Sequence, residues 1–278
     1  MGRIRGEFLA SPLALAALFT AAVWPLVGSG PALAAPACPQ TTVVGHRGSP
    51  ATAPENTMAS FAAAVRDGAD WLETDVLVSK DGVPVILHDS TLERLTGTNG
   101  RVADLTVAEL DRLRITVGPG DPQPIPHLTD LLDWVRASGV HLLLEIKEIG
   151  RPEDATTIGR LAAASGADIE ITSFYPEHLR TAHAAAPDLP LTLIQGSWYA
   201  RDPEGLPLTA IAVEHVLATP ERTRAEHAAG RAVYGWIAND SGTWQTLRAN
   251  GVDALITDNP GAARAWRDQQ PTACGGSA

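Results

Sequence analysis

Short apolar segments alternate with amphipathic segments along most of this chain. The apolar segments have the length of buried strands, and the segments between them carry apolar side chains at helical spacing. Eight strands are expected, at residues 41–46, 69–75, 141–146, 169–174, 191–194, 209–213, 231–237 and 254–257. Helices are expected between most of them, at residues 58–67, 128–137, 153–164, 176–185, 220–229, 242–250 and 261–267. Eight strand–helix units in one α/β chain predict a closed (β/α)8 barrel, the TIM barrel.

A single stretch, residues 76 to about 126, interrupts this alternation after the second strand. Asp81-Gly82 lies between two strand-like runs, and Asp-Gly is a strong hairpin signal. A short helix is expected near residues 107–113. We interpret the stretch as an insertion above the barrel and not as a separate domain, because it has little core of its own. Its return run is not counted as a barrel strand, since nine strands would not close this barrel.

The N-terminal segment is typical of a secretory signal peptide. Arg3 and Arg5 precede an apolar run, and Ala32-Leu33-Ala34 matches the small-x-small cleavage pattern. We expect removal of residues 1–34 at or near Ala34, which leaves one barrel domain at residues 35–278 in a secreted, extracellular protein. An uncleaved membrane anchor is the alternative.

Two cysteines, Cys38 and Cys274, lie close to the two ends of this mature chain. In an oxidising compartment, such a pair predicts a disulfide bond. The bond would bring the termini together, as the pairing of the first and last strands of a closed barrel does. Two unrelated thiols are the alternative.

The formal net charge of −11 argues against two classes of partner. A chain this acidic does not favour binding to nucleic acid or electrostatic docking on an anionic membrane. After the predicted signal peptide, no segment is apolar enough for stable insertion into a bilayer. The oligomeric state stays open.

Polar residues interrupt the predicted strands at their carboxyl ends, where the active sites of such barrels form. These residues are His46, Arg47, Glu73, Asp75, Glu145, Lys147, Ser173, Trp236, Asn239 and Asp258. Three of them, Glu73, Asp75 and Glu145, are carboxylates that would repel one another unless a cation holds them. Oxygen ligands suit Mg²⁺ or Ca²⁺ better than zinc. The alternative is that these acids cap loops or pair with arginines.

Arg47 and Lys147 would give this acidic chain a local positive charge that suits a phosphate group. For Lys147, the alternative is a salt bridge to Glu145 or Glu148. His46 and a histidine of the insertion, His88, are expected beside the same site. Two groups that titrate near neutral pH could cleave a phosphodiester, one by accepting a proton and the other by protonating the leaving alkoxide.

The other histidines are interpreted as structural residues. They are His127, His141, His178, His183, His215 and His227. Among them, His127 is the least clear, because it lies next to the end of the insertion.

Several motifs occur in a characteristic order. They are His46-Arg47-Gly48, Pro54-Glu55-Asn56-Thr57, Glu73-x-Asp75, His88-Asp89, Glu145-x-Lys147, Ser173-Phe174 and Ile256-Thr257-Asp258-x-Pro260. The ordered set resembles the glycerophosphodiester phosphodiesterase family over about residues 41–268. The resemblance implies a metal-dependent hydrolase that releases glycerol 3-phosphate and an alcohol such as choline or ethanolamine. It implies a divalent cation on the three acids, catalysis by His46 and His88, and a phosphate near Arg47 and Lys147, with Trp236 as a candidate substrate contact.

The chain departs from the pattern of this family at the rim of the predicted site. His127 replaces a small residue, Glu148 follows Lys147 where proline is common, and residues 235–239 read Gly-Trp-Ile-Ala-Asn instead of Trp-Thr-Val-Asn. These changes put the alcohol specificity in doubt more than the chemistry. Trp198 and Tyr199, in a loop after the predicted strand 191–194, could stack on a cationic headgroup; ordinary loop packing is the alternative.

The sequence leaves two other functions open. One is a phospholipase D or sphingomyelinase D-like phosphodiesterase of the same superfold, acting on intact phospholipid. The other is a non-enzymatic binding protein on a degenerate barrel. The sequence does not say which histidine is the acid, whether water or a substrate hydroxyl attacks phosphorus, or whether the cation is Ca²⁺ or Mg²⁺.

Overall fold

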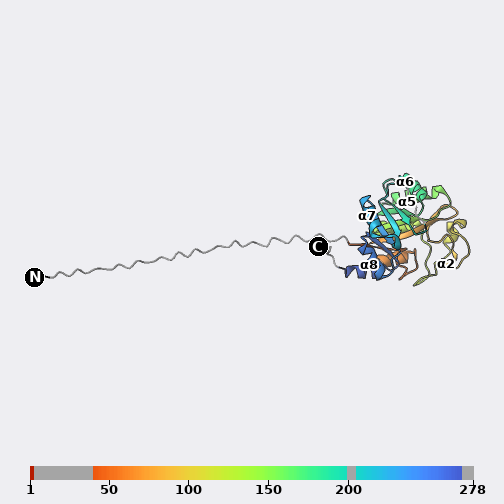
Figure 1. Ribbon diagram of the computed structural model, residues 1–278. Helices are drawn as coiled ribbons and strands as arrows, with labels where there is room; N and C mark the ends of the chain where they lie inside the picture. The colour runs from red at the N-terminus through yellow and green to blue at the C-terminus, as the bar shows by residue number, and fades with distance from the viewer. Residues whose placement is uncertain (3–39, 199–204, 271–278) are drawn as a thin grey trace. The chain divides into compact units, whose positions relative to one another are not determined.

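A closed parallel barrel forms the centre of the protein, as seen in a computed structural model that describes residues 1–2, 40–198 and 205–270 (Figure 1). Eight parallel strands are found among these residues. They are β1 (Thr42–Gly45), β2 (Trp71–Val78), β4 (His141–Ile146), β5 (Ile169–Ser173), β6 (Leu191–Gln195), β7 (Ala210–Glu214), β8 (Ala232–Trp236) and β9 (Ala254–Thr257). The neighbours run β1-β9-β8-β7-β6-β5-β4-β2, and pairing of β1 with β2 closes the ring. The predicted TIM barrel is therefore confirmed.

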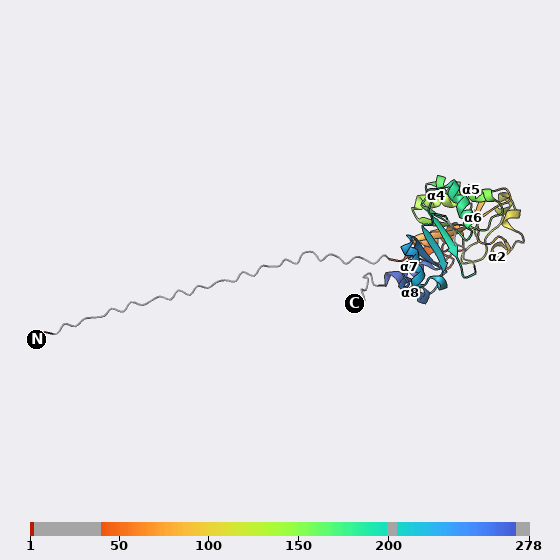
Figure 2. The same cartoon turned by 45° about the horizontal axis from the view of Figure 1, so that its top comes forward.

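Helices surround the strands, as Figures 1 and 2 show. They are α1 (Met58–Arg66), α4 (Leu128–Ser138), α5 (Pro152–Ser165), α6 (Pro176–Ala185), α7 (Pro220–Ala228), α8 (Ser241–Ala249) and α9 (Pro260–Asp268). Proline occupies the first turn of α5, α6, α7 and α9, where its fixed φ suits a helix and its missing N–H costs nothing. The observed ends agree with the predicted helices to within one or two residues.

The register of the strands decides which side chains face the barrel interior. Asp75 on β2 lies opposite Glu145 on β4, and Glu145 lies opposite Thr172 on β5. Since residues two apart on a strand share a face, Glu73 points to the same side as Asp75. The alternate residues, such as Leu72, are buried in the large apolar cluster that packs the strands against the helices.

The insertion after the second strand is present, and we call residues 76–126 the insertion lobe. It contains β3 (Pro84–Ile86), α2 (Glu93–Thr96), the 3-10 helix η1 (Val102–Asp104) and α3 (Val107–Leu110). The second strand was expected to end at Asp75. Instead, β2 continues to Val78 and pairs there with β3 in antiparallel fashion. One strand therefore belongs both to the barrel and to the lobe.

The expectation that the lobe has little core of its own was wrong. Nine apolar side chains form a separate buried cluster there: Leu77, Val85, Leu87, Leu92, Leu95, Val102, Leu110, Ile115 and Ile125. All but Leu77, which lies on β2, come from loops or from helices and strands of three or four residues, so no strand or helix periodicity reveals them in the sequence. The lobe is thus a packed unit that can hold a side chain in a fixed place.

Some predictions fall on residues that the structure does not describe. The signal peptide, Cys38, Cys274 and Tyr199 lie outside the described residues. Cleavage, secretion and the disulfide bond therefore stay predictions. Within the described ranges, no helix has the length and apolar character needed to cross a membrane.

Candidate active site

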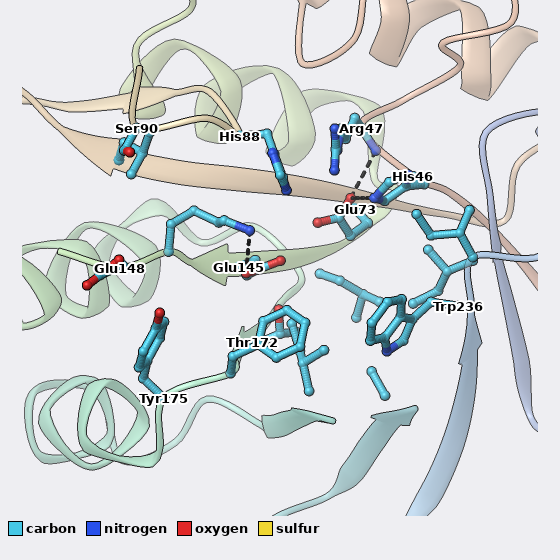
Figure 3. Close-up of a pocket in the computed structure, with 18 of the residues that line it drawn as sticks. His46, Arg47, Glu73, His88, Ser90, Glu145, Glu148, Thr172, Tyr175 and Trp236 are labelled. Atoms are coloured by element: carbon cyan, nitrogen blue, oxygen red, sulfur yellow. Dashed lines mark hydrogen bonds and ion pairs between the residues drawn. The ribbon is translucent and has the colours of Figure 1, made fainter. Parts of the chain in front are cut away.

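A pocket of about 430 Å³ opens where the carboxyl ends of the barrel strands meet the insertion lobe. Of the eight residues predicted to bind cation or substrate or to catalyse the reaction, seven line it: His46, Arg47, Glu73, His88, Glu145, Lys147 and Trp236. Figure 3 shows His46, Arg47 and His88 pointing into the pocket from one side, with the carboxylates of Glu73 and Glu145 nearby. An eighth predicted residue, Asp75, lies beneath them and is only 1% exposed.

The pocket has a polar half and an apolar half. The charged residues come from β2 and β4, from the segments that directly follow β1 and β4, and from the insertion lobe. The opposite wall is built from Leu143, Phe174, Ile194, Trp198, Ala212, Trp236 and Ile256. A ligand with one charged and one apolar part would therefore be held in a defined orientation.

A tight turn after β1 places the first two functional side chains. A Cβ on Gly45 would lie 2.4 Å from the carbonyl oxygen of Gly48, so a larger residue does not fit there. Arg47 has a left-handed backbone with a φ of 54°, which is uncommon for a residue other than glycine. In this conformation its backbone N–H donates to Glu73 Oε2 at 2.9 Å. The strained turn therefore ties β1 to the acidic site on β2.

Three buried carboxylates, Glu73, Asp75 and Glu145, meet at the polar end of the pocket. One oxygen atom from each lies within 4.8 Å of the others. Asp75 Oδ1 and Glu145 Oε1 accept no hydrogen bond of good geometry within the described part of the chain. Hard oxygen donors in this arrangement suit Ca²⁺ or Mg²⁺, so these residues fit a divalent cation. We call the three residues the acidic triad.

The pKa values of the acidic triad reflect this crowding. Burial raises the pKa of Glu73 well above its usual range, and the charges of Asp75 and Glu145 raise it further. Burial also raises the pKa of Glu145, to about 7. For Asp75, burial acts in the same direction, but Lys147 and Arg47 outweigh it and hold its pKa well below the usual range. A bound cation would oppose the raised pKa values of Glu73 and Glu145, because it favours the ionised carboxylates.

Two cations compensate the charge of the triad. Lys147 Nζ lies 2.9 Å from Glu145 Oε1 and 3.4 Å from Asp75 Oδ1, and Arg47 Nε lies 3.3 Å from Asp75 Oδ2. The salt bridge from Lys147 to Glu145, weighed as an alternative in the sequence, is present. It does not exclude a role with substrate, because Lys147 also lines the pocket.

His46 is held by the end of the last barrel strand. Its Nδ1 lies 2.6 Å from Asp258 Oδ1, and Asn239 Nδ2 donates to the other oxygen of Asp258 at 2.6 Å. This leaves Nε2 on the pocket side, 3.9 Å from Glu73 Oε2. A carboxylate on Nδ1 fixes the tautomer and the orientation of an imidazole.

His88 is held in the same way by its neighbour in the sequence. Its Nδ1 lies 2.6 Å from Asp89 Oδ1, which leaves Nε2 for the pocket. Burial lowers the pKa of His88, although the charge of Asp75 acts in the opposite direction. The neutral imidazole, which can accept a proton, is therefore the main form at neutral pH.

Some functional contacts were missed in the sequence. Asp258 was noted only as a strand-end acid, and nothing in the sequence indicated that it pairs with His46. Ser173 was expected at the mouth, but it is fully buried and its hydroxyl donates to the carbonyl of Ile146. The inward residue is its neighbour Thr172, whose buried hydroxyl has no hydrogen-bond partner within the described residues.

The remaining histidines lie away from the pocket lining. His141 pairs with Asp168 at 3.0 Å, and His127 contacts Asp111 in the insertion lobe at 2.8 Å. Their interpretation as structural residues agrees with these contacts.

The effect of a divalent cation on thermal unfolding is expected to depend on pH. Since Glu145 has a raised folded-state pKa of about 7, the metal-free protein loses stability as pH rises towards that value, whereas cation binding becomes easier. Added Ca²⁺ or Mg²⁺ should therefore raise the unfolding temperature more at about pH 8 than at about pH 5.5. Differential scanning fluorimetry measures this. Glu145→Gln should make the dependence less steep, and an equal shift at both pH values in the unaltered protein would contradict the prediction.

Comparisons with known proteins agree with this geometry. The sequence matches the glycerophosphoryl diester phosphodiesterase family over residues 46–262. A glycerophosphodiester phosphodiesterase of Caldanaerobacter subterraneus subsp. tengcongensis is 28% identical over 235 residues, which are 80% of this chain and 95% of that protein. The matched residues run from His46 past Asp258 and include every pocket residue named above.

Solved structures give similar matches. A phosphodiesterase of Oleispira antarctica, in complex with the product sn-glycerol-3-phosphate, has a TM-score of 0.75 and 25% identity, covering 83% of this chain and 98% of that one. A glycerophosphodiester phosphodiesterase of Agrobacterium tumefaciens has a TM-score of 0.69 and 26% identity, covering 81% and 99%. These relatives are matched over almost their whole length.

Proposed function

Because the chain belongs to the glycerophosphoryl diester phosphodiesterase family and is a phosphodiester hydrolase, we propose that it hydrolyses glycerophosphodiesters to glycerol 3-phosphate and an alcohol. We propose further that the reaction depends on a divalent cation, Ca²⁺ or Mg²⁺, and uses two histidines. The Oleispira relative in complex with sn-glycerol-3-phosphate supports the choice of product.

Two histidine–aspartate pairs at one pocket mouth carry the proposed mechanism. In both His46 and His88, Nδ1 is 2.6 Å from an aspartate oxygen, so that Nε2 is left for the substrate. One neutral imidazole accepts the proton of the attacking group, which is either water or a substrate hydroxyl whose cyclic phosphate is then opened by water. The other, in its protonated form, delivers a proton to the leaving alkoxide. Proton transfer requires that both imidazole rings keep a fixed orientation, and hydrogen bonds to Asp258 and Asp89 provide it.

The polar half of the pocket is the proposed phosphate site. Glu73, Asp75 and Glu145 would hold the cation. When bound, it would polarise a phosphoryl oxygen and offset the negative charge that develops in the transition state. Arg47 offers a planar fork of donors and Lys147 a compact charge, and both lie within 4 Å of triad oxygens. These two residues would hold the phosphate against the cation.

The apolar half of the pocket is proposed to take the carbon part of the substrate. The ring of Trp236 meets the rings of Phe174 and Trp198 edge to face, with centroids 5.7 and 5.8 Å apart. The buried indole N–H of Trp236 has no hydrogen-bond partner among the described residues, so it could donate to a substrate oxygen. Trp198 is 69% exposed at the rim. Because this apolar wall could also contact the apolar part of a lipid, a second candidate function is phospholipase D or sphingomyelinase D-like cleavage of a lipid.

A substrate panel separates the two candidates. The purified protein is assayed with glycerophosphocholine, glycerophosphoethanolamine, polymeric glycerol phosphate, lysophosphatidylcholine and sphingomyelin, each with Ca²⁺ and with Mg²⁺. Highest kcat/KM on a glycerophosphodiester supports the proposal. Turnover restricted to the two lipids would replace it with the second candidate, and tight binding without turnover would indicate a binding protein.

A further inference from the structure

His88 depends on the insertion lobe for its position, because it lies outside the barrel strands. Pairing of β3 with β2 fixes the backbone just before His88, and the backbone N–H of Leu87 donates to the carbonyl of Asp75 at 3.1 Å. β3 ends at Ile86, and beyond His88 the chain enters the rest of the lobe. Backbone hydrogen bonds hold the segment that follows, such as the one from the N–H of Val102 to the carbonyl of Ser90. The imidazole of His88 and the carboxylate of Asp89 are held by side-chain contacts.

One arginine makes these contacts from the lobe. Arg94, on α2, donates through Nε to Asp89 Oδ2 at 2.5 Å, and Asp89 holds His88 Nδ1 with its other oxygen. The two terminal nitrogens of Arg94 donate to the two oxygens of Glu55 at 2.7 and 2.9 Å. Glu55 belongs to the loop between β1 and α1, so Arg94 joins the lobe to the barrel.

The chain of contacts continues to the phosphate site. Glu55 Oε1 also accepts from a terminal nitrogen of Arg47 at 2.9 Å. The arginine pair lowers the pKa of Glu55 against the effect of its burial, so this carboxylate stays ionised. An unbroken series of charged contacts therefore runs from Arg47 through Glu55, Arg94 and Asp89 to His88. Figure 3 shows both of its ends, Arg47 and His88, in the pocket.

We propose that Arg94 is a positioning residue for the reaction: it locks the insertion lobe to the barrel mouth and holds Asp89 so that His88 Nε2 is aimed at the phosphate. This rests on the proposed role of His88. Arg94 does not line the pocket itself, so it acts on substrate through a residue that does. The proposed route is Asp89 and His88; the other route that the contacts offer is Glu55 and Arg47.

The chemistry of the site requires an arginine. Only a planar guanidinium can hold one carboxylate with two parallel hydrogen bonds and a second carboxylate through Nε. The side chain of Arg94 is 42% exposed, and ion pairs of this exposure contribute little to global stability. Loss of Arg94 should therefore affect turnover much more than unfolding.

Arg94→Gln should lower kcat by roughly 100-fold, which is the scale expected for a catalytic group displaced by about 1 Å. KM should change less than about threefold, since Arg47 keeps its own contacts with Glu55 and Asp75 when Arg94 is replaced. Arg94→Lys should recover only part of kcat, because lysine can hold one of the two carboxylates but not both. Arg112→Gln, an exposed arginine of the same lobe, is the matched control and should leave kcat unchanged.

A double-mutant cycle tests whether Arg94 acts through His88. If it does, Arg94→Gln causes no further loss of the residual activity of His88→Ala, measured at high enzyme concentration. An equal loss in both backgrounds would show that Arg94 acts elsewhere and would overturn the inference. If circular dichroism shows that Arg94→Gln does not fold, Arg94→Lys replaces it in the same double-mutant cycle.

The same variants separate this inference from the proposed mechanism. Wild-type activity in His88→Ala would refute the proposed mechanism. An inactive His88→Ala together with a fully active Arg94→Gln would refute only the role of Arg94.

Discussion

Replacing either His46 or His88 by alanine is expected to lower kcat by about 10²–10⁴-fold, the range typical of a general acid or base. Each imidazole is fixed through Nδ1 and presents Nε2 to the pocket beside the acidic triad. Alanine removes the only group at each position that can transfer a proton. The unfolding temperature should stay close to that of the unaltered protein, because both side chains lie at the rim of the barrel and not in its apolar core.

A third histidine provides the control for this experiment. His227 pairs with Asp253 at 2.8 Å and does not line the pocket, so His227→Ala should keep full activity. The rates are measured by release of glycerol 3-phosphate from glycerophosphocholine, with circular dichroism as the test of folding. Full activity in His46→Ala or in His88→Ala would refute the two-histidine mechanism.

Loss of the divalent cation, or of one member of the acidic triad, is the second large effect expected. Glu73→Gln should lower kcat/KM by about 100-fold or more, since a cation contributes several kcal/mol to stabilising the transition state. The metal-free variant should be at least as stable as the unaltered protein. Burial and the charges of Asp75 and Glu145 raise the pKa of Glu73, so its negative charge is unfavourable in the absence of a cation.

The stability measurement separates a metal ligand from a residue that only supports the fold. In the unaltered protein, EDTA should abolish activity, and added Ca²⁺ or Mg²⁺ should restore it. In Glu73→Gln the rise in unfolding temperature caused by the cation should be much smaller. Glu153→Gln, on α5 and outside the pocket lining, is the control. Unchanged activity after EDTA treatment and dialysis would contradict the proposed metal dependence.

The barrel and the acidic triad could be predicted because both depend on local patterns. Strand and helix segments alternate in the sequence, and Glu73 and Asp75 are two residues apart on one strand. The carboxyl ends of parallel strands meet at one end of the barrel, which brings Glu145 to the same place. Each of these steps needs only strand periodicity and the count of strands.

Other parts of the site could not be predicted, for physical reasons. Asp258 is 212 residues from its partner His46, and several polar residues at the barrel mouth could have made the same contact. Ser173 was expected at the barrel mouth, but Thr172 lines the pocket instead. Strand side chains alternate, so an error of one residue selects the opposite face. The core of the insertion lobe was missed because most of its apolar residues come from loops and from helices and strands of three or four residues, which are too short to show a periodic pattern. The position of His88 depends on that core.

Identifying the phosphorus-containing product tests the proposed reaction most directly. The purified protein is incubated with glycerophosphocholine and Ca²⁺ or Mg²⁺, and the products are followed by ³¹P nuclear magnetic resonance. Hydrolysis of the bond to the alcohol predicts that the phosphodiester signal is replaced by that of glycerol 3-phosphate, with one choline released for each. Phosphocholine as the phosphorus product, or an unchanged diester with both cations, would contradict it.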